Sequence, residues 1–130
     1  MSQFKYTSYG RTRQPKNVAG AHGTKLANPT AAAPSAATDG YPTENQRFLH
    51  VLLENAAAEN LTVQVWGYSH AFGAWGQLTD VRNQPAEVTA NNTSVHEVIE
   101  ISGIDRVYFR LSAGTFTDND DKLFAACSTF

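Results

Sequence analysis

The side chains that most often carry chemistry are sparse in this chain, and their spacing matches no metal-binding or redox pattern. The four histidines lie far apart in the sequence, at His22, His50, His70 and His96. No HExxH or CxxC motif is present, and Cys127 is the single cysteine, which excludes an internal disulfide. We therefore predict no metal site and interpret the histidines as structural or surface side chains. We expect Cys127 to be a small buried hydrophobe.

Nucleophilic and phosphate-binding motifs are also missing. A serine nucleophile needs a base held beside it by the fold, but Ser69 and His70 are adjacent in one turn, and no GxSxG motif occurs. The stretch Gly20–Lys25 (GAHGTK) lacks both the G-K-[ST] ending of a phosphate loop and a strand before it. We predict no catalytic residue, no cofactor and no enzymatic activity.

Two groups of carboxylates are candidates for cation ligands or for an acid–base pair. Asp118, Asp120 and Asp121 lack the glycine at position six and the glutamate at position twelve of an EF-hand loop. They are interpreted as a solvated turn. Glu97 and Glu100 lie on opposite faces of a predicted strand, because side chains alternate along a strand. These carboxylates are therefore poor partners for acid–base chemistry.

An aromatic-rich stretch, residues 61–81 (LTVQVWGYSHAFGAWGQLTDV), organises the rest of the chain. Its first half alternates apolar and polar residues, which predicts a strand, and glycines then mark a turn before an extended return. The predicted β-hairpin carries Trp66, Tyr68, Phe72 and Trp75 near its tip. All four are candidates for surface recognition. The alternative is that Trp66 and Trp75 form a cross-strand pair, leaving Tyr68 and Phe72 to make contacts.

The elements that must position this hairpin are other short strands with period-2 alternation. Arg106–Ala113 (RVYFRLSA) is the clearest, and the stretch between the hairpin and residue 95 is expected to loop out because it is polar and contains Pro85. The pattern predicts an all-β fold, an antiparallel, jelly-roll-like β-sandwich over residues 41–130, with a small barrel as the alternative. The remaining predicted strands are 48–54, 95–102 and 122–130.

Residues 1–40 differ in composition and are predicted to form a long, extended basic N-terminal arm. They are rich in Ala, Gly, Thr, Asn and Pro, so they bury too little apolar surface to order themselves in isolation. Residues 1–38 carry a net charge of +5, whereas residues 39–130 carry −7. The arm is therefore expected to bind an acidic protein surface, such as a neighbouring copy. The predicted partner-binding residues are Phe4, Lys5, Tyr6, Tyr9, Arg11, Arg13, Lys16 and Lys25.

Nucleic acid and membrane are not expected as partners. The arm's basic residues could contact phosphates, but the acidic body would repel the same polymer. No run of about 18 apolar residues is present, and the N-terminus lacks the apolar region of a signal peptide.

An Ala/Pro/Gly-rich arm, then LTVQVWGYSHAFGAWGQL, then VHEVIEISGIDRVYFRLSA, resembles the small virion proteins of tailed bacteriophages, above all the capsid decoration (cement) proteins. The resemblance is one of layout and carries no catalytic residue. It implies a non-enzymatic protein that is made in the host cytoplasm and binds the capsid exterior, often as a homotrimer. The implied partners are the major capsid protein and other copies of the chain. The alternative is a carbohydrate- or receptor-binding β-sandwich of a phage tail or capsid.

Overall fold

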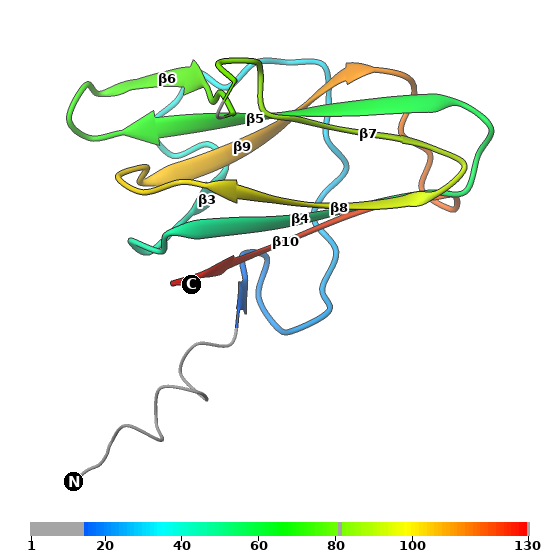
Figure 1. Cartoon of the computed structure of the whole chain (residues 1–130), viewed down its shortest axis with the longest axis horizontal. Coiled ribbons are helices and arrows are strands. Elements are labelled where there is room, and N and C mark those ends of the chain that lie inside the picture. Colours follow the sequence, from blue (N-terminus) through cyan, green and yellow to red (C-terminus); the bar gives the residue numbers. More distant parts are fainter. Residues whose placement is uncertain (1–14, 81, 130) are drawn as a thin grey trace, which may run out of the picture.

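The computed structural model describes residues 15–80 and 82–129, which form an all-β structure with no helix among them (Figure 1). Most strands coincide with the stretches where apolar and polar residues alternate, because alternation places one side of a strand in the core. The strands are β2 (Lys16–Asn17), β3 (Tyr41–Pro42), β4 (Phe48–Asn55), β5 (Asn60–Ser69), β6 (Ala74–Gln77), β7 (Glu87–Asn91), β8 (Ser94–Glu100), β9 (Arg106–Ala113) and β10 (Asp121–Ser128).

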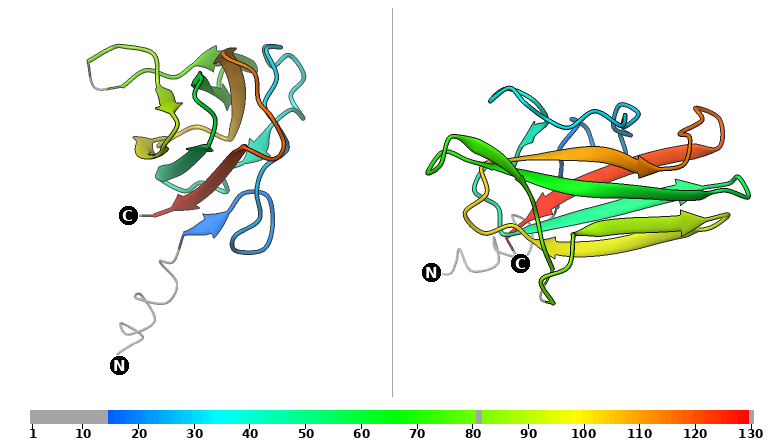
Figure 2. Two further views of the ribbon diagram at one scale, coloured as in Figure 1. Left: turned by 90° about the vertical axis from the view of Figure 1, so that its right-hand side faces the viewer. Right: turned by 90° about the horizontal axis from the view of Figure 1, so that it is seen from above.

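The strands form two antiparallel sheets that pack face to face, as predicted for a sandwich-like fold (Figure 2). The β4 sheet has the strand order β2-β10-β4-β8. The β5 sheet has the order β3-β9-β5-β6, and β7 pairs with the first half of β5 on the edge that β6 occupies further along. The predicted hairpin is confirmed as β5 and β6. No described helix is long and apolar enough to cross a membrane.

The core lies between the two sheets and is built from one side of each long strand. Leu49, Val51 and Leu53 of β4 have no exposed surface, and Val63 and Val65 of β5 face them across the core. Each such side chain contributes roughly 1.5–3 kcal/mol when it is fully buried. Cys127 belongs to the same cluster and is buried, as predicted.

One stretch that the sequence analysis expects to loop out is instead a strand. β7 pairs with β5, and Ala86, Val88 and Ala90 are buried in the core. The expectation was wrong because Pro85 and the polar neighbours conceal a short alternation of small apolar residues. Pro85 lies just before β7, where a missing N–H does not interrupt the ladder.

Residues 15–40, which we call the strap, pack against both sheets of their own chain. Leu26 is buried, and its N–H donates to the Leu123 carbonyl oxygen on β10 over 2.8 Å. Further along, the Thr30 carbonyl oxygen accepts the N–H of Leu111 on β9, also over 2.8 Å. The strap therefore crosses from the edge of the β4 sheet to the β5 sheet and closes one side of the sandwich (Figure 2). We expected residues 15–40 to bind a neighbouring subunit. In the structure they pack against β9 and β10 of their own chain instead.

Candidate partner-binding surfaces

The basic and aromatic residues predicted to bind a partner fall into two groups. The first group lies outside the described residues: Phe4, Lys5, Tyr6, Tyr9, Arg11 and Arg13. The second consists of Lys16 and Lys25, which are both exposed on the strap. Lys16 forms an ion pair with Glu44 of its own chain, with Nζ 2.7 Å from Oε1. Such an exposed pair contributes at most about 1 kcal/mol, so it does not prevent Lys16 from changing partners.

The four hairpin aromatics do not form one surface patch. Tyr68 is 8% exposed and lies opposite Trp75 in the ladder, with ring centroids 5.3 Å apart. The predicted pairing of Trp66 with Trp75 is therefore wrong, since Trp66 lies opposite Gln77. Tyr68 was expected to make external contacts but is buried. Phe72, in the turn, is 86% exposed and is the one aromatic of the four that is available for recognition.

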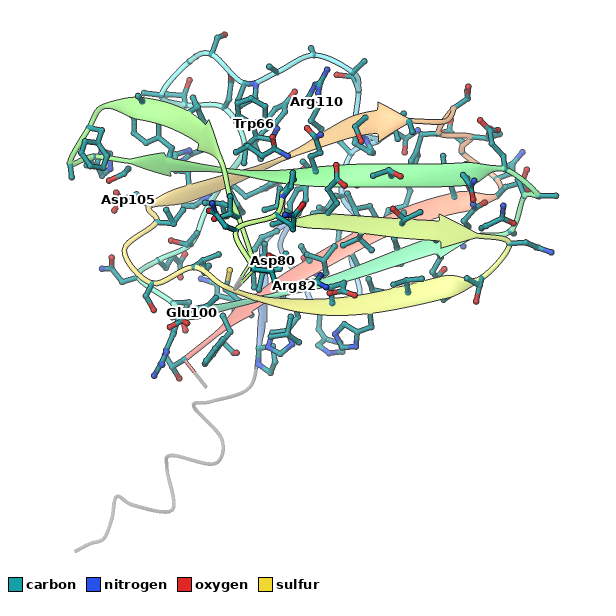
Figure 3. The ribbon with its side chains drawn as sticks, turned by 45° about the horizontal axis from the view of Figure 1, so that its top comes forward. Trp66, Asp80, Arg82, Glu100, Asp105 and Arg110 are labelled. Carbon is teal, nitrogen blue, oxygen red and sulfur yellow. The ribbon has the colours of Figure 1, made fainter. Side chains whose placement is uncertain are left out.

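The two tryptophans are held by polar neighbours on the outer face of the β5 sheet. The Trp75 indole Nε1–H donates to the Ala36 carbonyl oxygen of the strap over 2.8 Å. Trp66 donates to Gln64 Oε1, which also accepts a hydrogen bond from Arg110 (Figure 3). Both rings are half-buried and serve mainly to fasten neighbouring segments.

The outward-facing residues of β9 hold the second half of the strap. The Tyr108 hydroxyl donates to Ala32, and Arg110 Nε donates to Ala31, each over 2.8 Å to a backbone carbonyl oxygen. Arg106 binds three successive carbonyl oxygens at residues 38–40. Gly40 has a φ of +70°, and a Cβ there would lie 2.1 Å from a β9 carbonyl oxygen, so only glycine permits this approach. The cationic side chains of β9 are thus committed to the strap.

A groove on the outer face of the β4 sheet brings three histidines together. It has a volume of about 460 Å³, and His50 and His96 lie on adjacent strands with ring centroids 6.0 Å apart. His50 Nε2 is 2.9 Å from Ser128 Oγ. Burial, and secondarily the charge of His96, lowers the pKa of His50. No three His, Cys, Asp or Glu side chains among the described residues are placed to hold a metal. The other lining residues include Pro15, His22, Leu52, Glu54 and Phe124.

The acidic turn before β10 is only partly solvated, which differs from the prediction. Asp121 is 1% exposed, and its Oδ2 accepts the Thr117 N–H over 2.7 Å. Asp118 accepts a hydrogen bond from Asn28 of the strap. These carboxylates shape the turn and fasten the strap, while Asp120 remains exposed.

On the side of the sandwich opposite the strap, the edges of β7 and β8 enclose a groove of about 830 Å³. We call it the side groove. Asp80, Glu87 and Glu97 line it, and Arg82 pairs with Asp80, with Nη2 3.2 Å from Oδ2 (Figure 3). Sequence reasoning missed this site because half of it was assigned to a loop. The remaining lining residues are Gln84, Pro85, Ala86, Thr89, Val95 and Ile99.

Comparisons of the chain with protein-family models, curated protein sequences and solved structures gave no match.

Proposed function

We propose that this chain is a non-enzymatic virion structural protein of the decoration (cement) type. In this proposal a jelly-roll-like β-sandwich binds the outer surface of a tailed-phage capsid as a homo-oligomer, a trimer being favoured. An N-terminal arm contacts neighbouring subunits and joins them against internal pressure. The resemblance in layout and the two-sheet body support this assignment.

The observation that carries the proposal is the charge difference between the N-terminus and the body. Residues 1–14 contain Lys5, Arg11 and Arg13 and no acid, whereas residues 41–130 contain five Lys and Arg and eleven Asp and Glu, a net charge of −6. A basic segment attached to an acidic body is attracted to the body of a neighbouring copy. Many such contacts on one particle add avidity even where each is weak.

The contacts of the strap with its own chain favour residues 1–14 as the part of the arm that reaches a neighbour. The strap is hydrogen-bonded to β9 and β10 of its own chain. The proposed contact between subunits therefore rests on residues 1–14, which we call the terminal segment. Deletion of residues 1–40 would also remove Leu26 from the core, so a deletion of residues 1–14 is the cleaner test.

The test is cosedimentation of the purified chain with empty capsids of the tailed phage whose genome encodes it. The full chain should sediment with the capsids, and its terminal segment should become protected from trypsin at Lys5, Arg11 and Arg13. Deletion of residues 1–14 should remove most of this binding, whereas the control Lys122→Ala, at an exposed cation on β10, should retain it. A full chain that stays in the supernatant would refute the proposal.

A carbohydrate- or receptor-binding role is the second candidate, and the exposure of Phe72 favours it. Aromatic rings at a loop tip can stack on sugar faces. A glycan-array signal that Phe72→Ala abolishes, and that survives deletion of residues 1–14, would support this alternative over the cement proposal.

A further inference from the structure

The strap covers one lateral side of the sandwich and leaves the other side uncovered. On one side the strap covers β10 and the β9 edge. On the other side, β8 ends its sheet, and within residues 15–80 and 82–129 it pairs with β4 alone. An edge strand with a free row of N–H and C=O groups is a template for another strand.

The β8 edge is chemically selective. Val95 and Ile99 point into the core, so Glu97 lies on the same side and faces the side groove. Val98 lies on the outer face and is 54% exposed. A second copy of β8, paired antiparallel about its midpoint at residue 97, would bring Glu97 against the same carboxylate of the other copy. Like charges on paired strands are destabilising. The edge therefore favours a strand with cations on one face and apolar side chains on the other.

We infer that the β8 edge and the side groove bind the terminal segment of a second copy, which adds to the β4 sheet as a strand. Phe4–Tyr9 (FKYTSY) alternates, so Lys5 would share the groove face with Glu97. Glu87 lines the groove from the edge of β7, where its carboxylate accepts a hydrogen bond from Gln64. Phe4 and Tyr6 would then lie on the outer face and cover Val98. The inference rests on the proposed function in that both require the terminal segment to bind a neighbour.

The number of cations that can reach the side groove, and not chain length, favours a second copy over the chain's own terminal segment. β2 and β8 are at opposite edges of the β4 sheet, three strand spacings apart, or about 14 Å at about 4.8 Å each. Crossing that distance takes about five residues at about 3.3 Å per residue. The crossing would use Arg11 and Arg13, leaving Lys5 as the one cation for the groove. A terminal segment from a neighbour can place all three cations near the side groove.

Such a contact joins two different surfaces, the terminal segment of one copy and the β8 edge of the next. An interface of this kind is heterologous, and it closes into a ring when the rotation between copies permits. A three-membered ring would produce the trimer that the proposed function favours.

The test uses the full chain with Tyr6 replaced by the photo-crosslinking amino acid p-benzoyl-phenylalanine. Unlabelled and ¹⁵N-labelled chains are mixed at high concentration and irradiated, and cross-linked peptides are identified by mass spectrometry. We expect mixed-isotope cross-links from position 6 to peptides that contain residues 94–100. The yield should fall as ionic strength rises from about 0.15 M to about 1 M, because the screening length shrinks from about 8 Å to about 3 Å. Phe72 replaced by the same amino acid is the positional control.

Charge variants test the side groove itself. The double variant Glu87→Gln with Glu97→Gln should lower the cross-link yield about three- to tenfold, since each exposed ion pair contributes a fraction of a kcal/mol. The matched control Glu54→Gln with Asp120→Asn removes two carboxylates outside the side groove and should change the yield less than twofold. Circular dichroism verifies that both variants are folded.

Three other outcomes would overturn the inference. They are no cross-links above the positional control, cross-links within single chains alone, and cross-links to the groove on the outer face of the β4 sheet that His50 and His96 line. Capsid cosedimentation is scored separately. Capsid binding that persists while position 6 cross-links elsewhere would leave the proposed function intact and refute this site. Mixed-isotope cross-links to β8 without capsid binding would support this site and refute the proposed function.

Discussion

The Trp75 indole Nε1–H donates to the Ala36 carbonyl oxygen over 2.8 Å, and this bond joins the β5–β6 hairpin to the strap. The same ring lies against Tyr68 and Tyr108, with centroid separations of 5.3 and 6.0 Å. A side chain offered by the sequence as a recognition residue is thus a fastening between two segments nearly forty positions apart. The strap and the hairpin are stabilised together.

We predict that Trp75→Phe lowers the free energy of unfolding by about 0.5–1.5 kcal/mol, because the hydrogen bond to Ala36 is lost while an aromatic ring remains. Urea unfolding followed by circular dichroism measures the change. The control Phe72→Ala alters an exposed ring of the same hairpin and should stay within about 0.5 kcal/mol of the unmodified chain. Equal effects of the two substitutions would contradict the role assigned to Trp75.

Leu26→Ala should destabilise the fold by about 2–5 kcal/mol, the usual effect of opening a cavity at a buried leucine. Leu26 is 2% exposed and belongs to the same core cluster as the strand residues. The neighbouring Lys25→Ala is the matched control, because Lys25 is exposed on the same segment. Thermal or urea unfolding measures the free energy of unfolding of the two variants. If Leu26→Ala were as mild as Lys25→Ala, the strap would not be part of the core.

The free energy of unfolding should decrease as the pH falls below about 6.5. The pKa of His50 is lowered in the folded state, first by burial and then by His96, so the unfolded chain takes up the proton more readily. The contribution of neutral His50 to the free energy of unfolding is complete above its pKa in the unfolded chain. It is lost as the pH falls towards its pKa in the folded chain. His22 and Glu54, which line the same groove, also face this site.

His50→Gln should flatten the pH dependence of stability below about pH 6.5 while retaining a partner for Ser128. Urea unfolding at several pH values measures the slope. His70→Gln, in the exposed turn, is the control and should leave the slope unchanged. A slope that is the same with and without His50 would show that another group controls the pH dependence.

Cys127 should resist alkylation in the folded chain. Burial, with a smaller effect from Glu44, raises the pKa of Cys127 to about 11, so about one thiol in a thousand is ionised at pH 8. Iodoacetamide labelling followed by mass spectrometry should be slow in buffer and fast in urea. Comparable rates in the two solvents would mean that Cys127 is reached without unfolding.

Much of the fold was predictable because alternation is a local property of the sequence. Arg106–Ala113 shows it within eight residues, and its buried and outward faces are as expected. The candidate sites were less predictable. Tyr68 and Trp75 were identified as prominent residues, but their pairing depends on the register of β5 against β6, which a turn of four residues sets. The side groove depends on β7, whose small apolar residues give a weak signal.

Period-2 patterning alone specifies an all-β body, because a strand with one apolar face is stable only when that face is covered. Composition alone also separates a basic N-terminus from an acidic body. The burial of Leu26 and the open edge of β8 depend instead on how the two sheets assemble. Leu26 stands among polar and small residues, and its burial depends on where β9 and β10 lie, which no neighbouring residue encodes. The open β8 edge arises in the same way, from a strand order that forms only when segments distant in sequence meet.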